Sequence, residues 1–100
     1  MYKTLILPSA KNDIEEATIW YNKKQKGLGV KFTSYVRQKI ALIKQEPFIA
    51  STRYDNVKTA VLDTFPFMIH YLLNENEKVI IIIAVFHTSR DPKIWKRDSQ

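Results

Sequence analysis

Cysteine is absent from this sequence of 100 residues, and glycine occurs only twice. Without cysteine, the chain has no disulfide framework, no thiolate nucleophile and no cysteine-based zinc site. It also has no glycine-rich phosphate loop, no HExxH zinc motif and no serine elbow, which excludes the enzyme classes built on those motifs. The two histidines, His70 and His87, stand 17 positions apart, which is not a metal-ligand spacing. We therefore expect neither a bound metal nor a cofactor.

Long apolar segments are absent as well. The apolar run within the N-terminal MYKTLILPSAK is far shorter than a signal-peptide core or a membrane span, so it predicts a first strand. We expect a cytoplasmic protein with no membrane partner. With 45% hydrophobic and 12% aromatic residues, residues 1–100 are expected to form a single domain with a thin core.

Acidic residues are missing from Ala17 to Gln45, a segment that holds seven basic residues. The charges of the remaining residues sum to −1, so this one segment accounts for the net charge of +6. Such a surface can attract a polyanion such as RNA, DNA or an acidic protein segment, or it can be a solvated helical face. The candidate contacts to a nucleic acid or to another target are Lys23, Lys24, Lys26 and Arg37, with Arg90 near the C-terminus.

The first half of the chain predicts a strand followed by a helical hairpin. Residues 2–7 alternate like a strand, and Pro8 ends it just before Ser9, the expected N-cap of the first helix. Gly27 and Gly29 predict a tight turn between two helices. The second helix is expected over about residues 30–46, with an apolar stripe that packs on the first helix and on a sheet face.

The second half of the chain predicts a loop over residues 48–56 and then three strands. These cover residues 57–64, 66–74 and 79–86 and read as an antiparallel meander. Residues 79–86 are an unbroken apolar run of eight, rich in β-branched side chains, which favours a buried strand with both faces covered. We expect the other strands to pair around it.

The polar tail that follows predicts one short turn of helix. Asp91 is a suitable N-cap and Pro92 a suitable first helical residue, while Trp95 is expected to fold back onto the sheet. The expected fold class is therefore α+β, with an N-terminal strand, a two-helix hairpin, a three-stranded antiparallel meander and a short C-terminal helical turn.

The candidate chemical site is a cluster of cations around His87, at the end of the apolar run. Arg90 and Arg97 follow it closely, and Lys58 begins a neighbouring predicted strand. Together they could bind phosphate or stabilise a phosphoryl transition state, with His87 as a proton shuttle. Alternatively, the segment is a structural turn in which His87 only bonds to the backbone. His70 is interpreted as a structural histidine.

Two motifs in the second half make the whole chain resemble a known family. One is Phe65-Pro66-Phe67 leading to Tyr71, and the other is the C-terminal H-x-x-R-D-P-x-x-W-x-R, which runs from His87 to Arg97. These are similar to patterns of the RelE/ParE family, the toxins of bacterial type II toxin–antitoxin pairs. The last arginine stands one position earlier than in the family pattern, and Lys58 occupies a place where many members have arginine.

The resemblance implies a small α+β fold and neutralisation by a cognate antitoxin whose C-terminal segment wraps the toxin in a hetero-oligomer. RelE-like members cleave mRNA in the ribosomal A site, and ParE-like members poison DNA gyrase without a known catalytic centre. The R-D-P-x-x-W ending favours the ParE-like group and gyrase as the target. A ribosome-dependent mRNA endoribonuclease is the alternative, with His87, Arg90, Lys58 and Arg97 as its catalytic residues. A third alternative is a member that only binds its antitoxin.

Overall fold

The computed structural model describes residues 1–90. Over this range the chain forms two helices and five strands, in the order β1 (Lys3–Ile6), α1 (Pro8–Lys24), α2 (Leu28–Gln45), β2 (Thr52–Tyr54), β3 (Val57–Val61), β4 (Phe67–Asn74) and β5 (Val79–His87). The predicted N-terminal strand, helical hairpin and long apolar strand are confirmed. The predicted helical turn with Asp91, Pro92 and Trp95 lies outside the described residues, as does Arg97.

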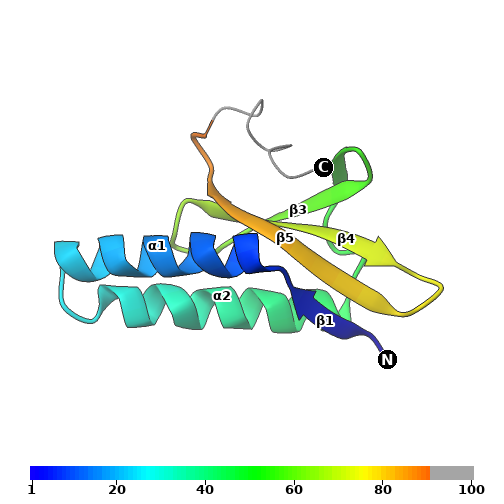
Figure 1. Cartoon of the computed structure of the whole chain (residues 1–100), viewed down its shortest axis with the longest axis horizontal. Helices are drawn as coiled ribbons and strands as arrows, with labels where there is room; N and C mark the ends of the chain where they lie inside the picture. The colour runs from blue at the N-terminus through cyan, green and yellow to red at the C-terminus, as the bar shows by residue number, and fades with distance from the viewer. Residues whose placement is uncertain (91–100) are drawn as a thin grey trace.

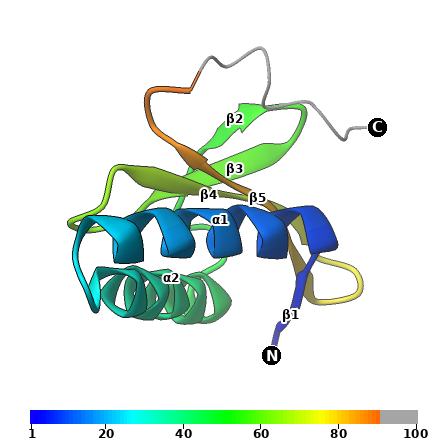
Figure 2. The ribbon, with the colours of Figure 1, turned by 60° about the vertical axis from the view of Figure 1, so that its left-hand side comes forward.

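The two helices form one layer and the strands the other (Figures 1 and 2). α1 and α2 run side by side and antiparallel, and together they cover one face of the sheet. The strand order is β1-β5-β4-β3-β2, so the apolar strand β5 lies between β1 and β4. β5 pairs parallel with β1 and antiparallel with β4. The sheet is therefore mixed, because the N-terminal strand adds to the outer side of the meander.

The main core lies between the helices and the sheet. Phe32 of α2 is fully buried, and its ring centroid lies 5.3 Å from those of Tyr21 and Phe65. Aromatic pairs at this separation add to the free energy gained by burying their surface. The sheet contributes four completely buried side chains to the same core, namely Ile69, Tyr71, Ile80 and Ile82. A second cluster contains Met68, Ala84 and Phe86.

A bulge in β5 sets which of its side chains join the main core. His70 pairs with Ala84 but Tyr71 pairs with Ile82, so Ile83 is an extra residue on β5. An extra residue reverses the alternation of faces along the strand. As a result, Ile82 and Val85 both belong to the main core although three positions separate them. After the bulge, the side chains of Val85 and His87 lie on the side of the sheet that α1 covers.

The first helix begins two residues earlier than predicted, at Pro8, because its N-cap is Leu7 and not Ser9. The prediction that Ser9 caps this helix is wrong. Proline has no N–H and a fixed φ, so it fits the first helical position and places Ser9 inside the helix. The Ser9 hydroxyl instead donates to the Ile83 carbonyl at 3.1 Å, which ties α1 to the bulge of β5.

The segment 48–56, predicted to be a loop, contains the short strand β2. Asp55 and Asn56 form the turn to β3 and both have positive φ, at 41° and 67°. Two such residues in sequence suit a tight hairpin turn. The meander therefore has four antiparallel strands in place of the predicted three.

Two boundaries also differ from the prediction. β3 ends at Val61, three residues early, because the chain turns at Thr64, whose φ is 74°. The interhelical turn uses Gly27, with φ of 87°, whereas Gly29 lies inside α2. A Cβ on Gly29 would collide with the Thr18 carbonyl and the Asn22 side chain, so its role is the close approach of the two helices. No helix in residues 1–90 is long and apolar enough to cross a membrane.

Candidate functional site

A cavity of about 180 Å³ lies where α1 passes the C-terminal end of β5. It combines one face of α1 with the ends of β4 and β5, and its lining residues are Asp13, Glu16, Ala17, Phe67, Val85, His87 and Arg90. The structure therefore brings together two of the four predicted catalytic residues, His87 and Arg90. It also adds two carboxylates that the sequence analysis did not assign to a site.

The carboxylates reach the cavity because of the helical spacing of α1. Residues 16 and 17 follow residue 13 by three and four positions, so both lie on the same face of the helix as residue 13. Asp13 Oδ2 accepts a hydrogen bond from the Val85 amide at 3.0 Å. Glu16 is exposed and accepts from the Asn12 side chain at 3.2 Å. This face of α1 is therefore both an anchor to β5 and a wall of the cavity.

His87 is half-buried, and its ring packs edge-on against Phe67 with 5.2 Å between centroids. Its Nδ1 lies 3.0 Å from the backbone nitrogen of Ser89 and 2.8 Å from the Ser89 hydroxyl oxygen. A backbone N–H can only donate, so Nδ1 must be the acceptor. The neutral imidazole therefore carries its proton on Nε2. In this form the ring can donate a hydrogen bond through Nε2, but that nitrogen cannot accept a proton.

Arg90 closes the turn after β5. Its backbone N–H donates to the His87 carbonyl at 3.0 Å, and its guanidinium carbon lies 4.9 Å from the centre of the Phe86 ring. The residue is exposed, so the guanidinium contacts the Phe86 ring while the rest of the group remains accessible to water. Arg90 therefore presents its positive charge to solvent just beyond the end of β5.

Lys58 does not join this cluster. It pairs with Tyr71 on β4, whereas His87 pairs with Phe67, four residues along the same strand. Four residues of strand span about 13 Å, to which the spacing between strands is added. The Lys58 ammonium donates to the Ala50 carbonyl at 3.3 Å, near the end of α2. The predicted convergence of Lys58 with His87 is therefore wrong, because the strand register carries the two residues to different ends of the sheet.

The basic residues of the hairpin are at the surface. Lys23 and Lys24 end α1, Lys26 lies in the turn and Arg37 lies on α2, and all four are exposed. Lys24 stands over the ring of Trp20, with 4.8 Å from Nζ to the ring centroid. Trp20 itself is 54% exposed, which is unusual for so large an apolar side chain. The end of the hairpin thus combines cations with an aromatic surface.

His70, interpreted above as a structural histidine, does not line the cavity beside His87. It is completely buried in the sheet, and its Nδ1 lies 3.0 Å from the Tyr54 hydroxyl. Its ring packs edge-on against Phe86, with 5.0 Å between centroids. Within residues 1–90, no group of three or more histidine, aspartate or glutamate side chains could hold a metal ion.

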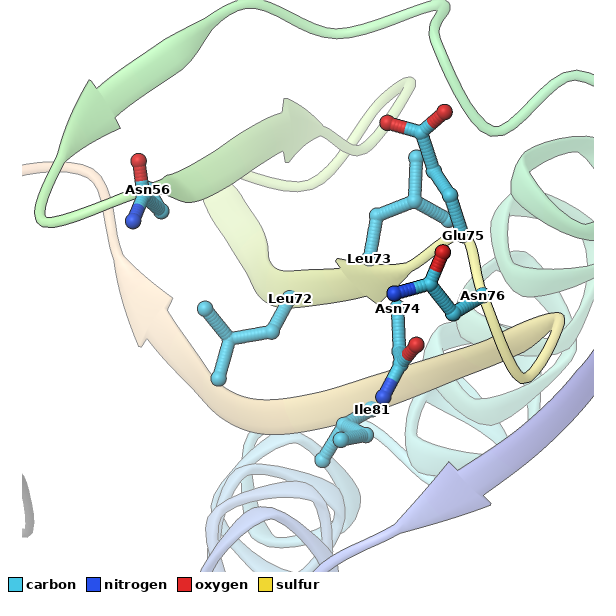
Figure 3. A pocket seen from close by; sticks show the side chains of 7 residues that line it. All are labelled: Asn56, Leu72, Leu73, Asn74, Glu75, Asn76 and Ile81. Carbon is cyan, nitrogen blue, oxygen red and sulfur yellow. The ribbon is translucent and has the colours of Figure 1, made fainter.

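A larger cavity, of about 600 Å³, lies at the opposite end of the sheet (Figure 3). Leu72 and Ile81 pair across β4 and β5 and form part of its lining, and asparagine side chains surround them. Its only ionisable lining residue is Glu75. We therefore choose the smaller cavity beside His87 as the candidate site, because four ionisable side chains line it and only one lines the larger cavity.

The described residues form an α+β fold with two helices over one face of a five-stranded sheet. The family model described as "ParE toxin of type II toxin-antitoxin system, parDE" matches residues 5–92. The chain therefore belongs to the ParE toxin family and is a toxin of a type II toxin–antitoxin system.

Solved structures share the fold at low sequence identity. The chromosomal ParDE system of P. aeruginosa includes a chain that is 16% identical, with a TM-score of 0.77, over 89% of this chain and 98% of that one. The intact RelBE complex of E. coli includes a chain that is 14% identical, with a TM-score of 0.67, over 90% and 100%. The isolated E. coli RelE toxin is 13% identical, with a TM-score of 0.66, over 99% and 97%. A search of curated proteins found no match.

Proposed function

We propose that this toxin inhibits growth by binding DNA gyrase, and that it does not cleave RNA. The observation that carries the proposal is the bond from the Ser89 backbone to Nδ1 of His87. RNA cleavage with His87 as the general base would require a ring nitrogen that accepts a proton from the attacking hydroxyl. Nδ1 is occupied by an obligate donor and Nε2 carries the proton, so the ring is not arranged as a general base.

The charges around His87 also favour binding over cleavage. Asp13 and Glu16 line the same cavity, and carboxylates repel the phosphate of an RNA substrate. Lys58, which would have to help Arg90 hold that phosphate, bonds instead to the Ala50 carbonyl. The arrangement suits a protein surface with mixed charges better than a site for a scissile phosphate.

In this proposal the target is contacted by the hairpin end and by the end of β5. The hairpin supplies the exposed cations Lys23, Lys24 and Lys26 and the aromatic surface of Trp20. The end of β5 supplies Arg90 and the Nε2–H of His87. Aromatic side chains at the centre of a contact, surrounded by cations, are typical of residues that dominate binding energy.

A cognate antitoxin neutralises the toxin in the same proposal, through a hetero-oligomeric complex. Support comes from solved structures with this fold, since the P. aeruginosa structure is described as a ParDE toxin–antitoxin system and the E. coli one as an intact RelBE toxin–antitoxin complex. The product of an adjacent reading frame is the natural candidate. Failure of that product to co-purify with the toxin would contradict this part of the proposal.

The test of the target uses the purified toxin with gyrase and relaxed plasmid, beside a map of mRNA 5′ ends after induction in a bacterial host. We expect loss of supercoiling and intact mRNA. Unchanged supercoiling at saturating toxin, with new mRNA ends in frame with codons, would replace gyrase by the ribosome. Unchanged supercoiling with intact mRNA and normal growth would indicate a protein that only binds its antitoxin.

A further inference from the structure

Phe86, the last residue but one of β5, faces away from the helices. Successive side chains of a strand point to opposite faces of the sheet, and its neighbour Val85 belongs to the main core. Phe86 lies instead in the second cluster, with Met68 and Ala84, and is only 1% exposed. A large aromatic ring is therefore buried near the end of the strand, on the face that α1 and α2 do not cover.

Arg90 reaches this ring from the turn that follows β5. The Thr88 amide donates to the Pro66 carbonyl at 2.8 Å, which ties the turn to the residue before β4. The Arg90 amide donates to the His87 carbonyl at 3.0 Å. These two bonds fix the backbone of the turn. The guanidinium carbon then lies 4.9 Å from the centre of the Phe86 ring, within the range in which the negative face of a ring attracts a cation.

The Phe86 ring is itself held by side chains of two other strands. The ring of His70 on β4 packs edge-on against it, with 5.0 Å between centroids, and is completely buried. His70 Nδ1 lies 3.0 Å from the hydroxyl oxygen of Tyr54 on β2. Close-packed side chains in a protein interior keep well-defined rotamers. The Phe86 ring is therefore a fixed contact for Arg90, whose own side chain is exposed.

Such a contact changes what Arg90 can contribute to binding. An exposed arginine without a contact samples many rotamers, and ordering it in an interface costs conformational entropy. A side chain that is already ordered in the free protein loses less of this entropy when it binds. The contact with the ring also uses no hydrogen-bond acceptor, so the N–H donors of the guanidinium remain available to a target.

We propose that Phe86 is a positioning residue, whose ring orders the Arg90 guanidinium before the target arrives. The inference rests on the proposed function in one respect, namely that Arg90 contacts the target. It goes further because Phe86 is buried and acts only through Arg90. A cation–π contact at an exposed site corresponds to about a two- to fivefold change in an equilibrium constant, and this is the size of the effect that we expect.

The test replaces Phe86 by a phenylalanine with three fluorine atoms on its ring. This residue has nearly the same shape, but its ring face is less negative and attracts a cation less strongly. We expect the affinity of the toxin for gyrase to fall by about two- to fivefold. The matched control places the same fluorinated residue at Phe65, which packs on Tyr21 and Phe32 in the main core. It should bind gyrase like the wild type.

A double-mutant cycle with Arg90→Ala separates positioning from a structural role. Arg90→Ala should keep part of its affinity for gyrase, because the hairpin end also contacts the target in the proposed function. In this background, fluorination of Phe86 should have no further effect. An equal loss of affinity with and without Arg90 would show that the ring supports the fold or touches the target, and it would overturn the inference. Wild-type affinity of Arg90→Ala would overturn it as well.

Nitrogen NMR relaxation of Arg90 Nε tests the same contact in the free toxin, because it measures side-chain mobility on the ps–ns timescale. We expect Nε to be ordered in the wild type and in the Phe65 control, and to become more mobile after fluorination of Phe86. Equal mobility in all three proteins would show that the ring does not order Arg90. That result would overturn the inference whatever the target is.

The outcome is separable from that of the proposed function. If the wild type neither binds gyrase nor changes supercoiling, the gyrase proposal fails, and the cycle is then measured by growth inhibition in a bacterial host, which assumes no target. A wild type that leaves growth unchanged would overturn both proposals. If the wild type binds gyrase and fluorination of Phe86 alters neither the affinity nor the mobility of Arg90, only the role of Phe86 fails.

Discussion

Asp13 on α1 accepts a hydrogen bond from the Val85 amide on β5, with 3.0 Å between Oδ2 and N. β1 pairs with β5 only as far as Ile82, and the bulge follows directly. Ser9 and Asp13, one helical turn apart, then bond to the carbonyl of Ile83 and the amide of Val85. Two side chains of α1 thus bond to backbone groups of β5 beyond the point where β1 stops pairing with that strand.

Asp13→Ala should lower the free energy of unfolding by about 1 to 3 kcal/mol, because the Val85 amide loses its acceptor in a partly buried place. Asp13→Asn is the control, since its amide oxygen can still accept from Val85. Urea unfolding followed by circular dichroism measures both variants. An alanine variant as stable as the asparagine variant would show that this hydrogen bond does not hold α1 to β5.

Gly29→Ala should destabilise the protein by about 2 kcal/mol, because the added methyl group meets the Thr18 carbonyl and the Asn22 side chain. The sign is informative, since alanine in an unobstructed helix would raise stability by about 1 kcal/mol. Gly27→Ala is a comparison in which the space is open but φ is 87°, and it should cost about 1 kcal/mol from backbone strain. A stabilised Gly29→Ala protein would contradict the close approach of α1 and α2.

Tyr71 should make stability fall at alkaline pH. Burial raises the pKa of its hydroxyl, and a hydrogen bond with the Ala50 backbone offsets part of that rise. The folded state therefore holds the proton of Tyr71 more tightly than the unfolded state. This contribution to the free energy of unfolding is lost as the pH rises above about 10. Tyr71→Phe loses the bond to the Pro47 carbonyl, which should cost about 1 kcal/mol at neutral pH.

The measurement is urea unfolding of wild type and Tyr71→Phe between pH 7 and pH 11. We expect the stability gap between the two proteins to narrow as the pH rises, because only the wild type gains an ionised Tyr71 on unfolding. Tyr21, whose pKa burial also raises, is common to both proteins and cancels in the comparison. A gap that stays constant across this range would contradict the assignment to Tyr71.

The sequence was sufficient to predict the elements whose patterns are long. The apolar run of β5 and the helical spacing of α2 identify buried elements, and the resemblance led to the correct family. β2 was missed because three residues are too few to show an alternation. The adjacent Asp55 and Asn56 are the available signal for its turn, since both residue types tolerate positive φ.

The site was predicted less well because it depends on register. Lys58 begins a strand near β5 in sequence order, yet its pairing with Tyr71 moves it away from His87. Asp13 was not assigned to the site from the sequence, although it lies beside Val85. That contact follows from where β1 ends and where β5 bulges, and neither feature has a local sequence pattern.

Of the two neutral tautomers of His87, the one protonated on Nε2 should predominate. One hydrogen bond from the Ser89 amide, worth about 1 kcal/mol, favours this tautomer by about fivefold. Two-bond nitrogen–proton NMR spectra of the imidazole distinguish the two neutral tautomers. Ser89→Ala keeps the backbone donor and should leave the tautomer unchanged. A ring protonated on Nδ1 would remove the main argument against RNA cleavage.

The cations at the hairpin end should set how fast the toxin finds its target. Replacement of Lys23, Lys24 and Lys26 by alanine should slow association with gyrase by about 10-fold at low salt, because charged surfaces steer encounter. These side chains are exposed, so stability should change by less than about 0.5 kcal/mol.

The matched control replaces Lys3, Lys11 and Lys78 by alanine, and these exposed residues lie outside the acid-free segment. Their replacement lowers the net charge by the same three units. Association rates are measured by surface plasmon resonance over a range of salt concentrations. The two triple variants should differ at low salt and converge at high salt, where screening weakens surface electrostatics. Equal rates for both variants at low salt would show that total charge, and not the hairpin surface, attracts the target.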